Sequence, residues 1–518
     1  MKKTSKLMLS FLFLVMLQVA GVGTINSQAV EKEKYFTADK VFCHTIGNSK
    51  VEVCGTTKES GTLKIPEKVV YKGKSYKVTR IADMNIYYQD KAITTDTIDG
   101  SSFAIDMPGF HSYQYAKADK FPSKVRELSC AGIQKLILPD TITYIGEGAF
   151  CNCRKLSTVQ FAKQYKKLVI GRNAFGKNKI KTLTFPKGTI ALKDNATGTA
   201  MNLVIPATVE KIGAGVVNNS TQKVFLKNKK FVMKNGILYT KGEKTLLGVS
   251  GNVFDNVVIS AKTTKIVERA FAGSKVTTVT LNDKITELGT GTFYNCKKLT
   301  AVKNTRAVMS IGYAAFGSCE ILSDVGEMKE LKKIDRAAFW KANKLVFMIS
   351  KKLSDIDIYA FAGTKTTGDM KITVDDGNDT FSIVCGLLVK SEKDKKTVML
   401  QMDKVDDLVI SEGITEVAVK LCATKSITYP ITLISQQGTV YVPGGSVEYL
   451  GNKVPSFGED YNVAVDNKKV TTVIVPAGCK ESYKKAIGDV IMIREDYNPL
   501  NDKRLVIVEK DRVSKNNK

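Results

Sequence analysis

The sequence is poor in the residues that catalysis and metal binding use most often. It contains only two histidines, His44 and His111. A histidine-based triad would need one of these two as its base, and neither lies in a recognisable nucleophile motif. No Cys-x-x-Cys pair occurs, and Cys151-x-Cys153 has the wrong spacing for a structural zinc site. Gly-rich phosphate loops are absent as well. We therefore expect no enzyme, no cofactor, and no catalytic, cofactor-binding or metal-binding residues.

Paired carboxylates are the remaining route to catalysis. Asp375-Asp376 and Asp406-Asp407 are such pairs in the sequence, and two carboxylates can hydrolyse glycosides. Adjacent carboxylates are far more typical of solvated turns, and this is the interpretation we adopt.

Long hydrophobic runs are also scarce, with one exception at the N-terminus. A basic start at Lys2-Lys3 precedes an apolar run over residues 7–22, and Ser27-Gln28-Ala29 ends in small residues. These features predict a signal peptide over residues 1–29, cleaved after Ala29. An uncleaved membrane anchor is the alternative. No cysteine precedes Cys43, which excludes a lipid-modified N-terminal cysteine, and no later run is long enough to cross a bilayer. We expect a secreted or cell-surface protein, with the periplasm as a further possibility.

Acidic residues are few relative to basic ones. Lys and Arg number 78 against 51 Asp and Glu, giving a formal net charge of +27. Such a charge attracts acidic partners. Export and the lack of a basic-aromatic stripe argue against nucleic acid, so acidic glycans, anionic surfaces and acidic host proteins are better candidates. The alternative is that scattered lysines only keep a long protein soluble.

A short phrase with a phenylalanine, usually after an alanine, recurs through the middle of the chain. The phenylalanines are Phe150, Phe175, Phe271, Phe293, Phe316, Phe339 and Phe361. Their spacings are 25, 96, 22, 23, 23 and 22 residues, and 96 is close to four periods of about 24. A fixed period in this range indicates a solenoid, in which each unit buries its apolar face against its neighbours.

One full unit predicts how a coil is built. Leu136-x-Leu138-Pro139 alternates as a strand does and stops at proline, which has no donor for a ladder. A second extended stretch from Ile142 to Ile145 turns at a glycine before Ala149-Phe150. The predicted fold is mainly β: a right-handed leucine-rich-repeat-like solenoid with about 22–24 residues per coil, capped at both ends.

Ten cysteines in an exported chain raise the question of disulfides. Three residues after the repeat phenylalanines stand Cys153, Asn178, Ser274, Cys296, Cys319, Ala342 and Thr364. A slot that accepts all of these is small and buried, so its cysteines are interpreted as core thiols. Cys43 and Cys54 lie outside the array and suit a cross-strand bridge in an N-terminal hairpin, although free thiols are equally compatible with the sequence.

Outside the repeats the chain divides into several segments. We expect a β lead-in that caps the array over residues 30–83, an insertion over 84–126 and the solenoid over 127–430. Two hairpins near 231–247 and 381–400 are expected to interrupt it, the first turning at Asn235-Gly236. Degenerate repeats and a C-terminal cap follow over 431–518, where two Val-Pro stretches, at Val442 and Val475, each predict a strand and then a short helix.

The insertion at 84–126 has two interpretations. Its tyrosines, its serines and His111 resemble the composition of adaptable binding loops. It is equally compatible with a degenerate repeat and a solvated excursion.

The repeat unit resembles that of a known family. Residues 145–156 and 311–322 both fit Ile-Gly-x-x-Ala-Phe-x-x-Cys-x-x-Leu, or a close variant of it. This pattern is similar to the BspA-like leucine-rich-repeat family of bacterial surface and secreted proteins, and the likeness covers residues 60 to about 490. The resemblance implies an exported protein involved in adhesion to host matrix proteins or to other cells. No wall-sorting motif is visible near Lys518, so how the protein would attach to a surface stays open.

The sequence thus predicts a monomeric, exported binding protein without a transmembrane segment once the signal is removed. Recognition would use outward-facing side chains of the stacked strands, among them Thr182, Thr184, Thr278 and Thr280, together with the insertion and the two hairpins. No single ligand-binding residue can be chosen from the sequence. The alternatives are an envelope protein that captures acidic glycans, a structural envelope component without a diffusible ligand, and, as the weakest, an enzyme hidden in the insertion.

Overall fold

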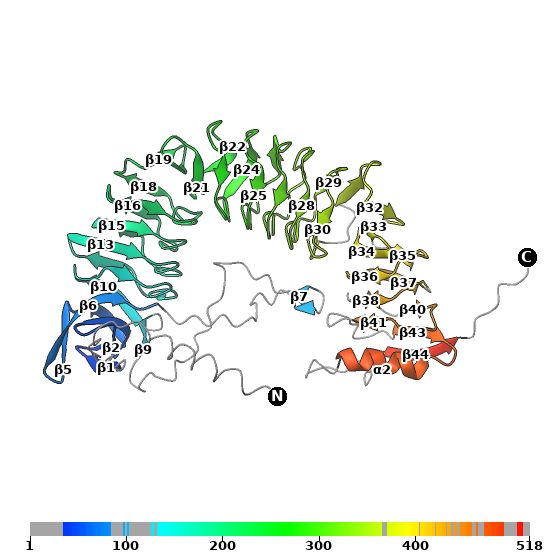
Figure 1. Cartoon of the computed structure of the whole chain (residues 1–518), viewed down its shortest axis with the longest axis horizontal. Coiled ribbons are helices and arrows are strands. Elements are labelled where there is room, and N and C mark those ends of the chain that lie inside the picture. Colours follow the sequence, from blue (N-terminus) through cyan, green and yellow to red (C-terminus); the bar gives the residue numbers. More distant parts are fainter. Residues whose placement is uncertain are drawn as a thin grey trace, which may run out of the picture.

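The chain forms a solenoid whose coils stack along an arch, with the N-terminal strands in one limb and helix α2 (Lys480–Ile491) in the other (Figure 1). The computed structural model describes residues 35–83, 97–98, 101–102, 126–128, 132–364, 370–402, 405–419, 421–430, 432–436, 440–442, 446–457, 463–464, 471–491 and 505–510. The signal peptide predicted over 1–29 and nearly all of the insertion predicted over 84–126 lie outside these residues. The mainly β solenoid predicted from the sequence is confirmed, with about 15 turns.

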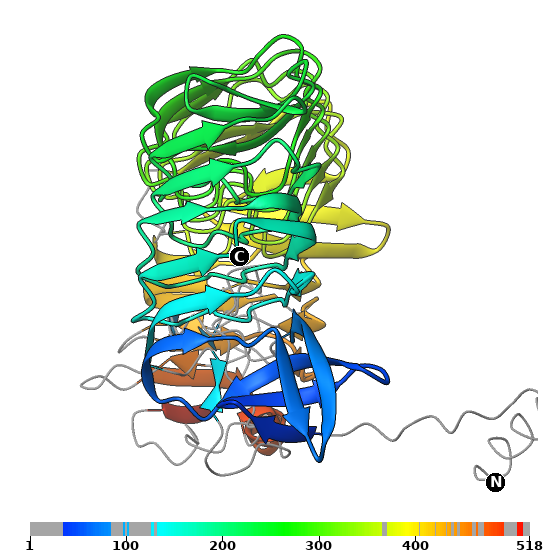
Figure 2. The same ribbon diagram turned by 90° about the vertical axis from the view of Figure 1, so that its left-hand side faces the viewer.

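Each coil contributes strands to two parallel ladders. Figure 2, in which the N-terminal limb faces the viewer, shows strands of successive coils stacked above one another in two columns. The first ladder is formed by the Leu-x-Leu-type strands. Its members are β4 (Ser60–Lys64), β10 (Gly132–Leu138), β12 (Thr158–Phe161), β14 (Thr182–Thr184), β16 (Asn202–Ile205), β18 (Lys223–Leu226), β22 (Phe254–Val258), β24 (Lys275–Thr280), β26 (Ala301–Lys303), β29 (Val346–Ile349), β31 (Lys371–Val374), β35 (Val405–Val409), β37 (Leu421–Tyr429), β40 (Ser446–Tyr449), β43 (Thr471–Pro476) and β44 (Leu505–Lys510).

The second ladder is formed by the strands that precede the Ala-Phe turn. Its members are β6 (Lys74–Ile81), β11 (Tyr144–Ile145), β13 (Gln164–Ile170), β15 (Lys187–Leu192), β17 (Lys211–Ile212), β21 (Thr245–Val249), β23 (Lys265–Ile266), β25 (Glu287–Leu288), β27 (Ser310–Ile311), β28 (Lys333–Ile334), β30 (Asp355–Ile356), β34 (Lys395–Gln401), β36 (Glu416–Val417), β38 (Ser435–Gln436) and β41 (Ser456–Phe457).

The other strands belong to the cap, the hairpins and short pairs. They are β1 (Tyr35–Ala38), β2 (Val41–Thr45), β3 (Lys50–Thr56), β5 (Lys68–Tyr71), β7 (Thr97–Ile98), β8 (Ser101–Ser102), β9 (Arg126–Glu127), β19 (Phe231–Lys234), β20 (Ile237–Thr240), β32 (Phe381–Val384), β33 (Leu387–Glu392), β39 (Val440–Tyr441) and β42 (Val463–Ala464).

The core of each coil follows from the alternation of its strands. In β16, Leu203 and Ile205 are buried while Asn202 and Val204 point outward, and Pro206 ends the strand. Because neighbouring coils are in parallel register, with Leu203 beside Leu183, the buried residues of one coil lie on those of the next. This arrangement removes apolar surface from water along the whole column.

The repeat phenylalanines form the most regular part of this core. The rings of Phe293, Phe316 and Phe339 are fully buried and stack at centroid distances of 5.3 Å. Phe361 continues the stack at 5.5 Å from Phe339, and Phe150 and Phe175 form a separate pair at 5.8 Å. The 96 residues between Phe175 and Phe271 hold four coil-to-coil steps, traced by backbone hydrogen bonds, as the period predicts.

The Ala-Phe turn has a backbone conformation that repeats from coil to coil. Residues two positions after each of the seven phenylalanines, and two positions before all of them except Phe361, have φ between +48° and +69°, which is the left-handed region. They are Gly148, Asn173, Arg269, Gly291, Ala314 and Ala337 before it, and Asn152, Lys177, Gly273, Asn295, Ser318, Lys341 and Gly363 after it.

This conformation turns the backbone N–H groups toward the next coil. The N–H groups of Gly291, Phe293 and Asn295 donate to carbonyls of the following coil at 2.7–2.8 Å. The turns are therefore hydrogen-bonded from coil to coil, as the strands are.

Where the small slot three residues after the phenylalanine holds a cysteine, the thiol donates a hydrogen bond to a carbonyl of the previous coil. Cys296 Sγ lies 3.0 Å from the carbonyl oxygen of Phe271, and Cys319 Sγ lies 3.1 Å from that of Phe293. Burial raises the pKa of the Cys319 thiol well above its usual range, so the thiol keeps the proton that it donates. The interpretation of these cysteines as core thiols is confirmed.

The N-terminal cap places Cys43 and Cys54 on adjacent strands, β2 and β3, but as free thiols. A β-bulge sets Cys43 opposite Val53 and leaves Cys54 as the extra residue of the bulge. The disulfide considered for this pair is therefore not formed here. Burial raises the pKa of the Cys43 thiol to about 12, so it is protonated at neutral pH.

The C-terminal end departs from one prediction. After Pro476 the expected helix is present as α2, but Ser446–Tyr449, where a second helix was expected, is strand β40. It pairs in parallel with β37 and β43, so ladder pairing overrides the local sequence pattern. Tyr429 and Tyr449 stack here at 4.8 Å and share the buried Gln436 as hydrogen-bond partner. Among the described residues, no helix is long and apolar enough to cross a membrane.

Two antiparallel hairpins divide the column into three blocks. The first is β19–β20 and the second is β32–β33, at the positions predicted from the sequence. The buried residues form three large clusters, spanning residues 36–247, 237–400 and 387–507, which meet at these hairpins.

The phenylalanine stack yields a first prediction. Replacing Phe316 with alanine should lower the free energy of unfolding by about 3–5 kcal/mol, because a fully buried ring stacked on both sides leaves a cavity. Urea unfolding followed by circular dichroism measures the change. Phe225→Ala is the control, because the Phe225 ring is 55% exposed and its loss should change stability by less than about 1 kcal/mol. Equal losses in the two variants would contradict the role of the stack.

The left-handed turn positions yield a second prediction. Lys177 has φ of +49° and an exposed side chain, so Lys177→Gly should raise stability by about 0.5–1 kcal/mol by relieving the steric cost. Lys179, two residues later, is exposed but is not left-handed. Glycine there should lower stability by a similar amount. The pair is compared in the same urea series, and a destabilising Lys177→Gly would refute the explanation.

Candidate functional site

The histidines do not form a catalytic centre among the described residues. His44 lies on β2, where its ring stacks on Tyr35 at 4.4 Å and its Nδ1 lies 2.9 Å from Oε1 of Glu52. His111 lies outside the described residues. Within the described part of the chain, no group of three or more His, Cys, Asp or Glu side chains could hold a metal ion.

The two aspartate pairs serve different local purposes. Asp375 accepts a hydrogen bond from the N–H of Gly377 at 2.9 Å, as a turn residue does. Asp406 and Asp407, expected in a turn, lie instead on strand β35, where Asp406 pairs with Lys425 at 2.9 Å and Asp407 accepts from Ser426 Oγ at 2.6 Å. The turn interpretation is therefore wrong for the second pair.

The threonines expected on the outer face lie on the first ladder but differ in exposure. Thr182 and Thr184 of β14 are exposed, whereas Thr278 and Thr280 of β24 are half-buried. Thr182 Oγ1 accepts a hydrogen bond from Asn202 Nδ2 of the next coil at 3.1 Å. These residues do not gather around a hollow in the structure.

The first hairpin creates an opening in the first ladder. Strands β19 and β20 join the second ladder on the N-terminal side of β21, in the order β19-β20-β21-β23. The first ladder gains no strand at this level, and β18 pairs only with β16 while β22 pairs only with β24. Each ladder strand occupies about 4.8 Å, so two strands added on one side spread the coils on the other. The coils stay joined at their turns, where the N–H of Gly251 donates to the Thr221 carbonyl at 2.6 Å.

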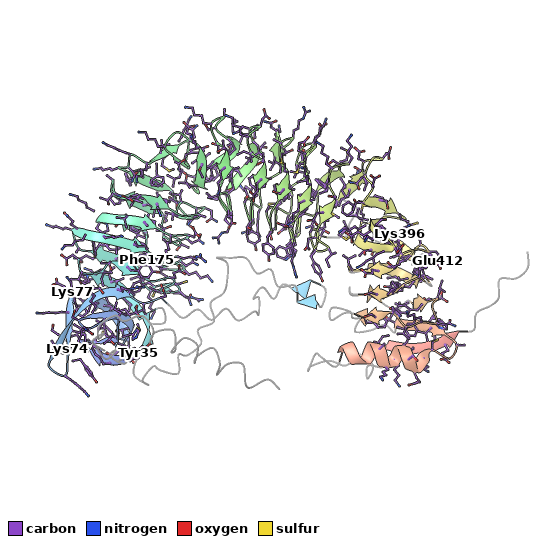
Figure 3. The ribbon with its side chains drawn as sticks, in the orientation of Figure 1. Tyr35, Lys74, Lys77, Phe175, Lys396 and Glu412 are labelled. Atoms are coloured by element: carbon purple, nitrogen blue, oxygen red, sulfur yellow. The ribbon has the colours of Figure 1, made fainter. Side chains whose placement is uncertain are left out.

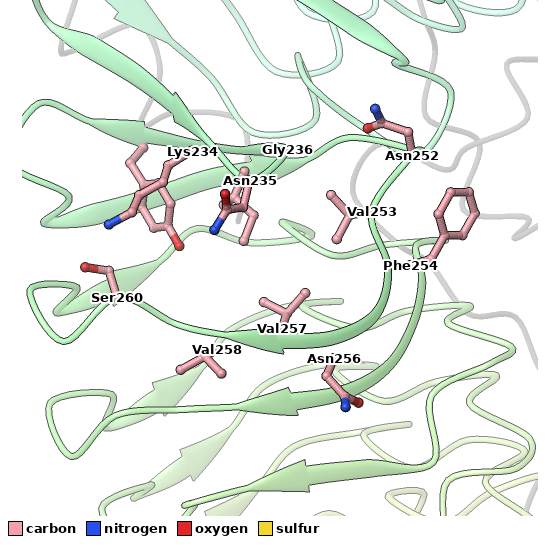
Figure 4. Close-up of a pocket in the computed structure, with 12 residues that line it drawn as sticks. Lys234, Asn235, Gly236, Asn252, Val253, Phe254, Asn256, Val257, Val258 and Ser260 are labelled. Atoms are coloured by element: carbon pink, nitrogen blue, oxygen red, sulfur yellow. The ribbon is translucent and has the colours of Figure 1, made fainter.

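A pocket of about 370 Å³ lies in this opening. In Figure 4 the hairpin residues Lys234, Asn235 and Gly236 lie across the pocket from Val257 and Val258 of β22. A second hollow of about 340 Å³ begins at Phe254, the first residue of β22. It is lined by Phe254, Gly273, Ser274, Lys275, Asn295, Lys297 and Lys298. We call the two together the β22 groove.

The β22 groove combines exposed apolar side chains with polar ones and has a basic end. Val258 is 72% exposed and Phe254 is 50% exposed. Lys275 Nζ lies 5.0 Å from the centre of the Phe254 ring, and Lys297 and Lys298 are exposed beside it. None of the residues that line the groove is acidic.

At the other end of the groove, Lys234 pairs with Glu243 at 3.2 Å. Hydrogen bonding by Ser260 and by Lys234 holds the pKa of Glu243 below its usual range. Elsewhere lysines project from both limbs of the arch, as Lys74, Lys77 and Lys396 show (Figure 3), so the net charge is spread over the molecule.

The second hairpin repeats the same topology. Strands β32 and β33 join β34, and the first ladder breaks between β31 and β35. Residues 254–260 and 405–411 correspond, with Val409 at the position of Val258 and 60% exposed. The chemistry differs, because Asp407 stands where the first site has Asn256, and the exposed Cys385 where it has Asn235.

Sequence reasoning found the hairpins but missed the groove. The duplicated hairpin was visible as Asn235-Gly236 and its counterpart 150 residues later. The break in the first ladder was not, because the sequence does not say which ladder the added strands join. The one available signal was that Phe254 and Val258 interrupt the usual alternation of the strand.

Comparison with known proteins identifies the repeats. Residues 127–235 and 250–367 match the model of the BspA type leucine-rich repeat region in six copies. The interval between the two matches, residues 236–249, contains β20 and β21, so the hairpin interrupts the family pattern as well. No curated protein matches the chain significantly.

The solved structures that match the chain include two bacterial proteins described as leucine-rich. A leucine rich cell surface protein from Faecalibacterium prausnitzii is 17% identical, with a TM-score of 0.41, over 67% of this chain and 96% of that one. A leucine-rich repeat protein from Eubacterium ventriosum is 16% identical, with a TM-score of 0.39, over 64% and 94%. The pneumococcal vaccine antigen PcpA is 13% identical, with a TM-score of 0.32, over 92% and 98%.

The two hairpin tips offer a matched test of how the first one is packed. Gly236 and Gly386 have φ of +75° and +74°, but a Cβ at Gly236 would lie 2.3 Å from Val253 Cγ2, whereas one at Gly386 meets nothing within 4 Å. Gly386→Ala should therefore cost about 1 kcal/mol of backbone strain. Gly236→Ala should cost more, by about 1–3 kcal/mol for the overlap. Urea unfolding compares the two, and equal costs would show that the first tip is not tightly packed.

Proposed function

We propose that this chain, whose solenoid is built of BspA-type leucine-rich repeats, is an exported binding protein that mediates adhesion to host matrix proteins or to other cells. The observation that carries the proposal is the β22 groove, a concave surface with exposed Phe254 and Val258 on a fold of stacked repeats. Exposed apolar residues in a hollow are typical of protein interaction sites. Repeat proteins commonly bind partners along such extended surfaces.

Export is part of the same proposal. It rests on the basic and apolar N-terminal residues 1–29, whose composition is that of a signal peptide. A location on the cell surface or outside the cell follows from export and from the family of the repeats. We propose further that the protein acts without catalysis, because the β22 groove carries no pair of groups suited to acid–base or nucleophilic chemistry.

The excess of basic residues favours a second candidate function. A net charge of +27 would draw acidic glycans of a cell envelope to the protein. Such binding is electrostatic and is screened over about 8 Å at physiological ionic strength, whereas burial of apolar side chains resists salt. Salt dependence therefore separates the two functions.

The test is binding of the purified chain to a panel of immobilised matrix proteins and to heparin, by surface plasmon resonance from 50 mM to 1 M salt. Adhesion predicts saturable binding to at least one matrix protein that weakens less than about tenfold over this range. Glycan capture predicts binding to heparin that falls by several orders of magnitude. Binding to neither partner would contradict both functions and favour a structural component of the envelope.

A further inference from the structure

We propose that the β22 groove binds an extended, acidic segment of a partner protein, which adds to the free edge of β22 as an extra strand. This inference rests on the proposed function, because it names the way in which a protein partner is held. The expected ligand is a peptide with apolar residues at alternate positions and acidic residues at the end that lies over Phe254.

The backbone of β22 has one edge without a ladder partner. In a parallel pair, alternate residues direct their N–H and C=O groups to the same neighbour. The N–H of Ile259 donates to the Thr280 carbonyl at 2.9 Å, so the backbone N–H and C=O groups of Ile259 and Val257 point toward β24. Asn256 and Val258 therefore direct their backbone groups the other way, into the groove. No strand among the described residues pairs with this edge.

Free edges of this kind are rare in the interior of a solenoid. Among the described residues, the strands of the first ladder are linked from coil to coil except at the two hairpins and between β12 and β14, so interior free edges occur only at these breaks. An exposed strand edge is a template for another strand, and peptide recognition by strand addition uses it directly. Main-chain hydrogen bonds then supply affinity, and pockets for alternate side chains supply specificity.

The groove lies along the edge that an added strand would cover. A neighbouring strand needs about 4.8 Å, and the hairpin adds two strands to the other ladder only. The volume of about 370 Å³ lies directly beside Asn256, Val257 and Val258, so it is placed along the edge to be covered. β22 is five residues long, which sets the length of the segment that it can pair with.

The side chains around the groove specify the chemistry of that segment. Exposed Phe254 and Val258 offer apolar contacts at the two ends of β22. At the Phe254 end, Lys275, Lys297 and Lys298 present three ammonium groups, and no lining residue neutralises them. Charge complementarity therefore favours carboxylates at this end.

The second opening provides an internal control of opposite character. The N–H of Ile410 donates to the Thr428 carbonyl at 3.0 Å. The backbone N–H and C=O groups of Val409 therefore point away from β37, as those of Val258 point away from β24. Asp407 replaces Asn256 at this opening, and the lysine beside it, Lys425, is paired with Asp406. An acidic segment should not bind there.

Proline substitution tests the edge without disturbing the existing ladder. Val258→Pro removes an N–H that points into the groove and is not used by β24, whereas Val258→Thr keeps that N–H and the shape of the side chain. Val409→Pro makes the same change at the second opening. A Lys297→Glu/Lys298→Glu double variant tests the contribution of the basic end of the groove.

The probes are fluorescein-labelled Asp-Asp-Val-Thr-Val-Thr and the same peptide in reversed order, which cover the parallel and antiparallel directions. A version with lysine in place of aspartate tests charge, and a version N-methylated at alternate residues tests main-chain bonding. Fluorescence anisotropy with the full chain gives the affinities. We expect one acidic probe to bind and Val258→Pro or N-methylation to weaken it by at least about tenfold. Val258→Thr and Val409→Pro should change it by less than about threefold, and the lysine double variant should weaken it by about tenfold and reduce its salt dependence.

Several outcomes would overturn the inference. These are no binding of either acidic probe at millimolar concentration, equal binding of the lysine probe, or equal affinity for the N-methylated probe. The last readout uses the unaltered protein, so it decides the matter even if circular dichroism shows that Val258→Pro does not fold.

The matrix-protein experiment keeps this inference separate from the proposed function. If the wild-type chain and a folded Val258→Pro variant bind a matrix protein equally, strand addition at β22 is refuted and the adhesive function stands. If the wild-type chain binds no matrix protein but binds the acidic probe through β22, the adhesive function is refuted and the strand-addition site stands.

Discussion

The structure depends on hydrogen bonding from each coil to the next, in the turns as well as in the strands. A solenoid whose turns were unpaired would bury backbone groups without partners around its whole length, at a cost comparable to a lost hydrogen bond for each. Here the left-handed positions around the repeat phenylalanines direct alternate N–H groups along the stacking axis. The same geometry fixes the height of each ring above the last, so that Phe293, Phe316 and Phe339 stack. The thiols of Cys296 and Cys319 then donate hydrogen bonds to the carbonyl oxygen of the phenylalanine one coil earlier.

Regularity of this kind makes any interruption conspicuous and consequential. A hairpin inserted between two coils can satisfy its own strands only by joining one of the two ladders. When it joins the second ladder, the first ladder is left with two unpaired edges, and the hydrophobic core divides at the same place. The β22 groove is therefore a product of the ladder geometry rather than of a special local sequence. The same device recurs about 150 residues later with the same strand order.

The sequence could predict the local features of the coils but not which strands pair over long distances. The period of the phenylalanines, the small slot after them and the Asn235-Gly236 turn are local patterns, and each of them predicted the observed structure. Long-range pairing was not predictable in this way. Ser446–Tyr449 follows a Val-Pro stretch like the one that precedes α2, yet it is a strand because two neighbouring strands offer it hydrogen bonds. Asp406 and Asp407 are likewise residues that the local sequence places in a turn, but they lie on β35 because it pairs with β37. The groove was missed because exposure at Phe254 and Val258 has meaning only when the missing neighbour of β22 is known.

Two openings with one backbone geometry and different side chains suggest how such a solenoid acquires specificity. The backbone supplies a free edge that any extended segment could pair with, so it cannot discriminate between partners by itself. Discrimination falls to the side chains beside the edge, which are Lys275, Lys297 and Lys298 at the first opening and Asp407 with the Asp406–Lys425 pair at the second. Because these residues are exposed, they can be exchanged at little cost to the stability of the coil. The buried phenylalanines and the residues of the left-handed turns cannot be exchanged without a loss of stability. Duplication of a hairpin block followed by changes in the exposed residues would thus produce new recognition sites while the ladder that supports them stays the same.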